Sequence, residues 1–160
     1  MEQWSNYFMA TAGAAAALTG LIFVAVSLNL QRILSMKHLP SRALGSLILL
    51  VNVLVISSFT LIPNQPILYL GCEILVVDII LWGVCLSKDI AMVRNTLPQY
   101  KINYLRNLAF TQVAMVPYLI AGFCMCCKSA AGFYWLIPAI TFSIIKSLID
   151  SWVLLVEINR

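Results

Sequence analysis

Charged residues are scarce in this sequence of 160 residues. Asp, Glu, Lys and Arg make up only 10% of the chain and apolar residues make up 62%, while mean hydropathy is +0.95. A soluble domain normally carries roughly a quarter charged and about half apolar residues. The composition therefore excludes a sizeable soluble domain, and it predicts an integral membrane protein with the lipid bilayer as its first partner.

Histidine and the common catalytic motifs are also missing. The only histidine is His38, on the predicted opposite side of the membrane from the outermost cysteines, and there is no phosphate-binding loop, nucleophile triad or zinc-protease signature. We therefore expect no metal site, no cofactor and no enzyme activity of these classes. The net charge of +4 does not indicate nucleic-acid binding, because the basic residues lie in short loops between apolar runs.

What the sequence does contain is a series of five apolar segments. Each is long enough to cross a bilayer as a helix, which takes about 20 residues. Four connections separate them: a basic loop, the Pro63–Pro66 turn, a mixed stretch with a break at Leu97-Pro98, and a turn after Lys128. We predict an all-α bundle of five transmembrane helices in a single domain, residues 1–160, with spans at about 4–31, 42–62, 67–87, 107–127 and 133–158.

Basic residues are distributed unevenly between the two sides of this predicted bundle. One side receives Lys128 alone, and the other receives Arg32, Lys37, Arg42, Lys88, Arg94, Lys101, Arg106 and Arg160. Basic loops stay in the cytoplasm. We therefore expect the amino terminus outside and the carboxyl terminus in the cytoplasm.

The last apolar segment carries two opposite charges, Lys146 and Asp150. Four residues separate them, so on a helix they share a face and can bond to each other. Ser143 and Ser147 fall on or beside the same face. Each charge near the centre of a bilayer costs roughly 2.5 to 3.5 kcal/mol on insertion scales. Such residues are rare unless they pair or serve a function.

Further polar residues are expected at similar depth. With a rise of about 1.5 Å per residue, the midplane passes near Asn52, Asp78 and Lys146, and Glu73 lies roughly 7 to 8 Å towards the outside. If Asp78 and Lys146 face each other, the ammonium group is shared between Asp78 and Asp150. The cluster is then either a structural clasp between two spans or part of an ion or proton path.

These two interpretations lead to two functions. The first is a homo-oligomeric channel or transporter whose path uses Asp78, Lys146, Asp150, Glu73 and Asn52, with subunits sharing the pore because five helices scarcely enclose one. The second is a non-conducting regulatory or scaffold protein that acts on a partner complex. Its contacts would be small-residue helix faces and the basic cytoplasmic loops.

Small residues are concentrated in the first span. Gly13 with Ala17, and Ala16 with Gly20, have the small-xxx-small spacing that lets another helix approach closely. The predicted helix-packing positions are therefore Gly13, Ala17 and Gly20. The neighbour is either another helix of the same subunit or a helix of a partner.

The chain has five cysteines. Cys124 and Cys127 have C-x-x-C spacing at the predicted outer end of the fourth span, with Cys72 at a comparable level, so an oxidising exterior would permit a disulfide. A membrane thiol oxidoreductase is a remote alternative function, because the second outer cysteine pair that such enzymes need is missing. Cysteine also serves as a small apolar residue in membrane helices.

The first 70 residues or so resemble a known family. The segment 17–30, the basic loop after it, Leu39-Pro40 followed by Arg42-Ala43, and Leu61-Ile62-Pro63 are similar to a family of small bacterial multi-pass inner-membrane proteins. Some members carry the label modulator of FtsH protease. The resemblance implies bacterial origin and residence in the inner (cell) membrane. It implies no site residues.

Overall fold

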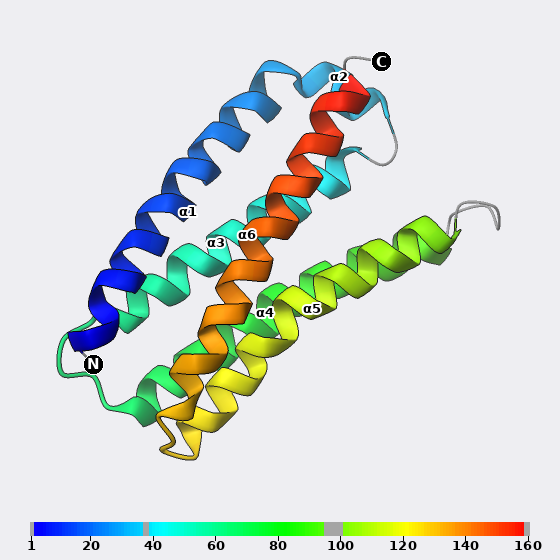
Figure 1. Ribbon diagram of the computed structural model, residues 1–160. Coiled ribbons are helices and arrows are strands. Elements are labelled where there is room, and N and C mark those ends of the chain that lie inside the picture. The colour runs from blue at the N-terminus through cyan, green and yellow to red at the C-terminus, as the bar shows by residue number, and fades with distance from the viewer. Residues whose placement is uncertain (1, 37–38, 95–100, 159–160) are drawn as a thin grey trace. The chain divides into compact units, whose positions relative to one another are not determined.

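The computed structural model describes residues 2–36, 39–94 and 101–158, and these residues form helices and turns without any strand (Figure 1). Five helices are long and apolar enough to cross a membrane, namely α1, α3, α4, α5 and α6. The prediction of an all-α chain with five such segments is confirmed. The helix bounds are α1 Glu2–Leu28, α2 Leu30–Ser35, α3 Leu39–Thr60, α4 Ile67–Arg94, α5 Lys101–Cys126 and α6 Ala131–Ile158.

The helices differ in detail from the expected spans. The short helix α2 occupies the start of the expected basic loop, α4 continues past the predicted end at residue 87 to Arg94, and α5 begins at Lys101 instead of residue 107. Helices α4 and α5 are therefore longer than their apolar runs, because hydropathy marks the part that suits lipid and not where backbone hydrogen bonding stops. Helix α1 instead ends at Leu28, before the predicted residue 31. His38 and the predicted break at Leu97-Pro98 lie outside the described residues.

The chain divides into two compact units. The first comprises residues 1–63 and 144–160. In it α1 and α3 run side by side in opposite directions (Figure 1). Helix α1 buries Phe8, Ala15 and Ile22, one residue in every seven, which is the spacing of a narrow contact stripe. Thr11 Oγ1 and Ser57 Oγ lie 3.1 Å apart and link the two helices.

One end of the first unit is closed by α2. Ile33 from this helix packs with Leu39 and Ala43 of α3 and with Leu154 of α6, and all four are buried. The break between α1 and α2 falls at Asn29, whose side-chain Nδ2 donates to the Ala25 carbonyl at 3.0 Å. That bond satisfies a carbonyl near the helix end, where intrahelical donors run out.

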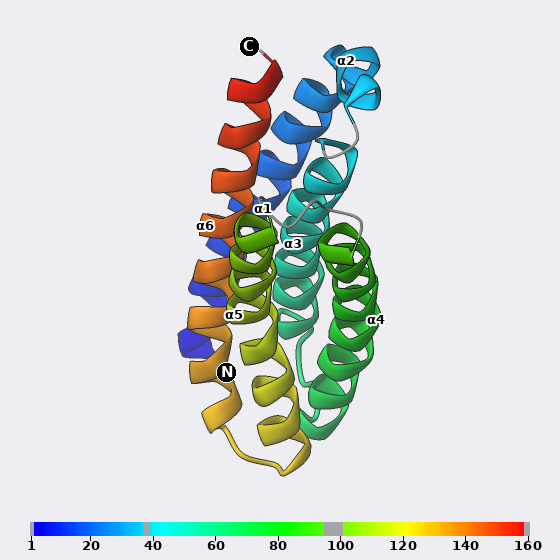
Figure 2. The same cartoon turned by 90° about the vertical axis from the view of Figure 1, so that its right-hand side faces the viewer.

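The second unit, residues 64–143, is built on an antiparallel pair, α4 and α5. The two helices remain adjacent when the view is turned (Figure 2). A Cβ atom added to Gly71 of α4 would lie 2.8 Å from the Cys126 nitrogen and 2.9 Å from the Gly122 oxygen of α5. The two backbones therefore meet where both helices lack a side chain.

The same unit is also held by a polar contact and by a tight helix end. Trp82 Nε1 of α4 donates to Gln112 Oε1 of α5 at 2.7 Å. After α5, the Lys128 nitrogen donates to the Met125 carbonyl and the Ser129 nitrogen to the Cys124 carbonyl, at 2.9 and 3.0 Å. With Lys128 at φ 59°, this is a Schellman motif. It reverses the chain towards α6.

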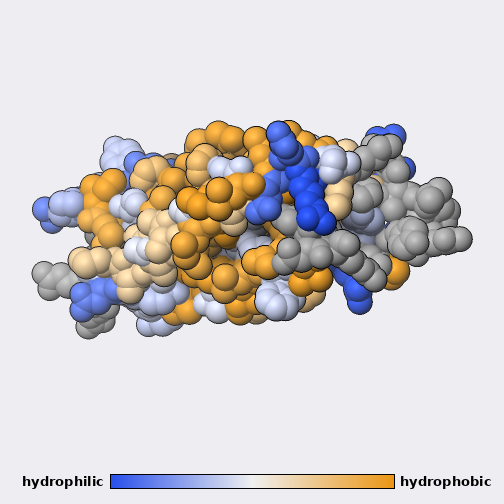
Figure 3. Space-filling view, turned by 90° about the horizontal axis from the view of Figure 1, so that it is seen from above, coloured by the Kyte–Doolittle hydropathy of each residue, from blue (hydrophilic) through white to orange (hydrophobic). Residues whose placement is uncertain are grey.

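Much of the surface is apolar. Large hydrophobic side chains such as Leu21, Phe23, Val76 and Phe123 are more than half exposed, and apolar side chains cover much of the face in Figure 3. Contiguous exposed apolar surface of this kind marks a membrane or protein interface. Together with five long apolar helices, it supports a multi-pass membrane protein.

Candidate functional site

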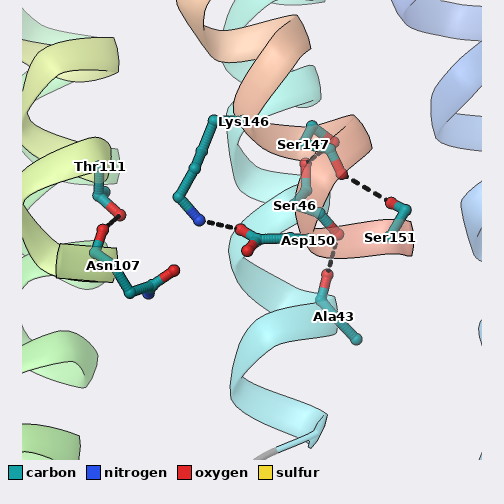
Figure 4. Close-up of polar contacts among 8 residues, drawn as sticks. All are labelled: Ala43, Ser46, Asn107, Thr111, Lys146, Ser147, Asp150 and Ser151. Atoms are coloured by element: carbon teal, nitrogen blue, oxygen red, sulfur yellow. Dashed lines mark hydrogen bonds and ion pairs between the residues drawn. The ribbon is translucent and has the colours of Figure 1, made fainter. Parts of the chain in front are cut away.

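The first unit contains a buried ion pair within one helix. Lys146 Nζ and Asp150 Oδ2, one helical turn apart on α6, form a salt bridge, and their side chains are 5% and 7% exposed (Figure 4). The i,i+4 spacing places both groups on one face, as the sequence predicts. Both charges are buried in the first unit and joined by this salt bridge, so the pair is the candidate site.

Serine side chains beside the pair connect α6 to α3. Ser147 Oγ donates to the Ser46 carbonyl at 3.1 Å, and both serines are fully buried. Ser46 Oγ in turn donates to the Ala43 carbonyl at 2.9 Å, and Ser151 Oγ donates to the Ser147 carbonyl at 2.8 Å. Figure 4 shows these bonds next to Asp150. The recorded hydrogen bond between α3 and α6 is thus made by a serine.

The energetics of the pair differ from those of the serines. Burying two charges costs several kcal/mol per ion before their attraction repays it, and apolar residues of similar volume are often as stable or more stable, by about 1–4 kcal/mol. The Lys146–Asp150 bond joins two residues of the same helix. That bond by itself therefore adds no link between helices.

The other predicted path residues lie on α3 and α4. Asn52 is buried on α3 in the first unit, and Asp78 is buried on α4 in the second. Glu73, half-buried near the start of α4, accepts a hydrogen bond at 2.6 Å from Gln65 Nε2. That bond ties the Pro63–Pro66 turn to α4. The pairing of Asp78 with Lys146 stays a prediction.

The small residues of α1 face no neighbour in the first unit. Gly13, Ala17 and Gly20 are exposed, and a Cβ atom added to either glycine would meet no atom within 4 Å. The glycines that pack closely are Gly71, Gly122 and Gly132 of the second unit, and none of them is among the predicted packing positions. Gly122 and Cys126 do have small-xxx-small spacing, which is a usable signal.

The cysteines show a contact that was not predicted. Among the described residues, no disulfide joins any of the five, which include the predicted pair, Cys124 and Cys127. The thiol contact that the structure records joins Cys72 of α4 to Cys126 of α5, with the two sulfur atoms 3.8 Å apart. The C-x-x-C spacing within one helix predicted a pair at Cys124 and Cys127, whereas the Cys72–Cys126 contact depends on which faces of two helices meet.

The first unit also holds a cavity of about 410 Å³ between α1, α2 and the carboxyl-terminal half of α6. Its lining is almost entirely aliphatic, so it suits hydrocarbon better than water or ions. Neither Lys146 nor Asp150 lines it. The lining residues are Leu18, Leu21, Ile22, Ala25, Val26, Asn29, Ile33, Leu148, Ser151, Leu154 and Leu155.

Within the described part of the chain, no group of three or more His, Cys, Asp or Glu side chains is placed to hold a metal ion. Comparisons with protein-family models, with curated proteins and with solved structures found no match to this chain. The comparisons therefore indicate no function, and the proposal below is argued from the candidate site.

Proposed function

We propose that this chain is a multi-pass membrane protein that moves protons or small cations, with Lys146 and Asp150 as the exchange site. The observation that carries the proposal is the salt bridge between these two side chains, each more than nine-tenths buried, inside a helix apolar enough to cross a membrane. Ionisable groups in such segments commonly line ion and proton routes.

The exchange follows from charge balance. In the resting state the Asp150 carboxylate and the Lys146 ammonium neutralise each other. A proton or cation that reaches Asp150 must compete with the ammonium group for the carboxylate, and this attraction is strong at low dielectric constant. The site therefore binds its cation weakly and releases it, as conduction requires.

Three other residues belong to the proposed path. Asp78, Glu73 and Asn52 supply polar groups at or outside the predicted midplane. Because five helices scarcely enclose a pore, copies of the chain share it in a homo-oligomer. The distribution of Lys and Arg supports an amino terminus outside and a carboxyl terminus in the cytoplasm, and the resemblance of the first 70 residues or so supports the bacterial inner membrane.

The test is flux through liposomes that contain the purified protein. We expect proton, sodium or potassium flux above that of protein-free liposomes. Asp150→Asn and Lys146→Met should each reduce it by about tenfold or more, which corresponds to about 1.4 kcal/mol in the barrier. Lys128→Met is the matched control, because Lys128 is exposed in the turn after α5 and should leave flux unchanged.

Two outcomes contradict the proposal. No flux of any tested ion across a range of pH excludes transport by the purified chain. A robust flux that Asp150→Asn and Lys146→Met leave unchanged excludes the proposed site even for a channel.

The second candidate function is a non-conducting membrane protein that regulates or scaffolds a partner complex. The observation that favours it is the open small-residue face of α1, where Gly13 and Gly20 have no neighbour within 4 Å of an added Cβ atom. Close helix approach needs such a face. Two results would support this function over transport. The purified chain would show no flux, and the double variant Gly13→Leu with Gly20→Leu would no longer associate with the partner complex in membranes.

A further inference from the structure

The contact between α4 and α5 in the second unit brings two cysteines together. Cys72 lies five residues after the start of α4, and Cys126 is the last residue of α5. Their sulfur atoms are 3.8 Å apart. Cys72 is exposed and Cys126 is half-buried, so a reagent can reach the pair without unfolding the unit.

The backbone of the two helices holds this pair in place. Gly71 immediately precedes Cys72, and a Cβ atom added to Gly71 would lie 2.8 Å from the Cys126 nitrogen. Gly122, one helical turn before Cys126, presents its oxygen 2.9 Å from the same added atom. The approach of the cysteines is therefore set by two glycines that meet face to face, and not by the rotamer of either thiol.

This separation is suited to bond formation. A disulfide has its sulfur atoms about 2.0 Å apart, so the two sulfurs must approach by about 1.8 Å. Rotation of the two side chains covers a movement of that size, whereas helices held at a larger separation would have to shift.

We propose that Cys72 and Cys126 are an oxidation site that closes to a disulfide between α4 and α5. The bond is a modification of this chain, distinct from the C-x-x-C pair that the sequence suggests, and it does not depend on whether the protein transports ions.

The reaction is thiol–disulfide exchange with an oxidant that carries a disulfide, R–S–S–R. The exposed Cys72 thiolate attacks one sulfur of the oxidant, which gives a mixed disulfide and releases one R–S⁻. Cys126 then attacks Cys72 Sγ, which forms the Sγ–Sγ bond and releases the second R–S⁻. The two cysteines lose two electrons and two protons, and the oxidant is reduced to two thiols.

The experiment uses the 160-residue chain in detergent. The protein is treated with oxidised glutathione, denatured and labelled with a thiol-specific reagent. We expect the number of labelled thiols to fall from the five of the reduced chain to three. Peptide mass spectrometry should place the bond between Cys72 and Cys126. A reductant should restore all five labels.

Single substitutions test which cysteines react. Cys72→Ser and Cys126→Ser should each abolish the loss of label, while Cys124→Ser and Cys127→Ser should still lose two labelled thiols. Gly71→Ala should slow closure at least severalfold, and Gly83→Ala, on the same helix but with no neighbour within 4 Å of its added Cβ atom, should not slow it.

Three results overturn the proposal. The first is a count that stays at five under conditions that oxidise a free dithiol of similar exposure. The second is a bond mapped to Cys124 or Cys127 in place of Cys72 or Cys126. The third is loss of two labelled thiols in both Cys72→Ser and Cys126→Ser.

Discussion

Glycines lie within long apolar helices in both units, but their surroundings differ. Gly13 and Gly20 on α1 are open, whereas Gly71 and Gly122 lie where α4 and α5 touch. The buried stripe of α1 passes through Ala15, and Gly13 lies roughly 160° away from it at about 100° per residue. A small residue therefore indicates that close approach is possible, and only the position of the packed face decides whether it occurs.

The largest change in stability is expected at the glycine contact of the second unit. Gly71→Ala places a methyl group against backbone atoms of α5, which cannot rotate away as a side chain does. We expect a loss of about 1–3 kcal/mol in the free energy of unfolding, the usual cost of overpacking, measured by thermal unfolding in detergent. Gly83→Ala is the control and should unfold at or above the wild-type temperature. Equal midpoints for the two variants would show that α4 and α5 do not meet at Gly71.

A smaller effect is expected at the polar link of the same unit. Gln112→Leu removes the acceptor of the Trp82 indole N–H and should cost about 1 kcal/mol, within the range measured for hydrogen bonds between membrane helices. Gln31→Leu, an exposed change on α2, should cost nothing in the same unfolding assay. A Gln112→Leu variant as stable as the wild type would mean that the bond contributes no net stability.

The corresponding link in the first unit should be weaker. Ser57→Ala removes the partner of Thr11 Oγ1, but the Thr11 hydroxyl still donates to the Phe8 carbonyl at 3.1 Å. No polar group is left unsatisfied, so we expect a loss of about 0.6 kcal/mol or less. A loss larger than that of Gln112→Leu would reverse the proposed difference between the units.

The smallest effect is expected on the open face of α1. Gly13→Leu and Gly20→Leu add side chains where no neighbour lies within 4 Å, and leucine forms helices better than glycine by up to about 1 kcal/mol. The unfolding temperature of the isolated chain should stay constant or rise slightly. A clear decrease would show that this face packs within one copy of the chain.

Much of the fold could be predicted because its signals are local. Apolar run length gave the five long helices, and the Pro63–Pro66 and Lys128 turns contain residues that end helices. The spacing of Lys146 and Asp150 predicted their salt bridge, which depends only on the pitch of one helix.

The features that the sequence did not reveal depend on which helix faces meet. The Ser147–Ser46 bond, the Gly71–Gly122 contact and the Cys72–Cys126 pair each join residues far apart in the chain. The periodicity of apolar residues along one helix does not indicate which face of that helix packs against another helix, because almost every face in a membrane protein is apolar. For the same reason C-x-x-C spacing pointed to Cys124 and Cys127, while the recorded contact uses Cys126 and a cysteine on another helix.

We propose that the charges of Lys146 and Asp150 serve transport and do more than keep the helix neutral and well packed. Exchanging them, Lys146→Asp with Asp150→Lys, keeps the pair neutral and puts the acid first, an order that suits a helix at least as well. The most direct test is the initial rate of cation or proton flux in liposomes that contain this double variant. We predict a folded protein whose flux is reduced by about tenfold or more relative to the wild type. Flux at the wild-type rate would contradict the claim, because neutrality of the pair would then be all that matters.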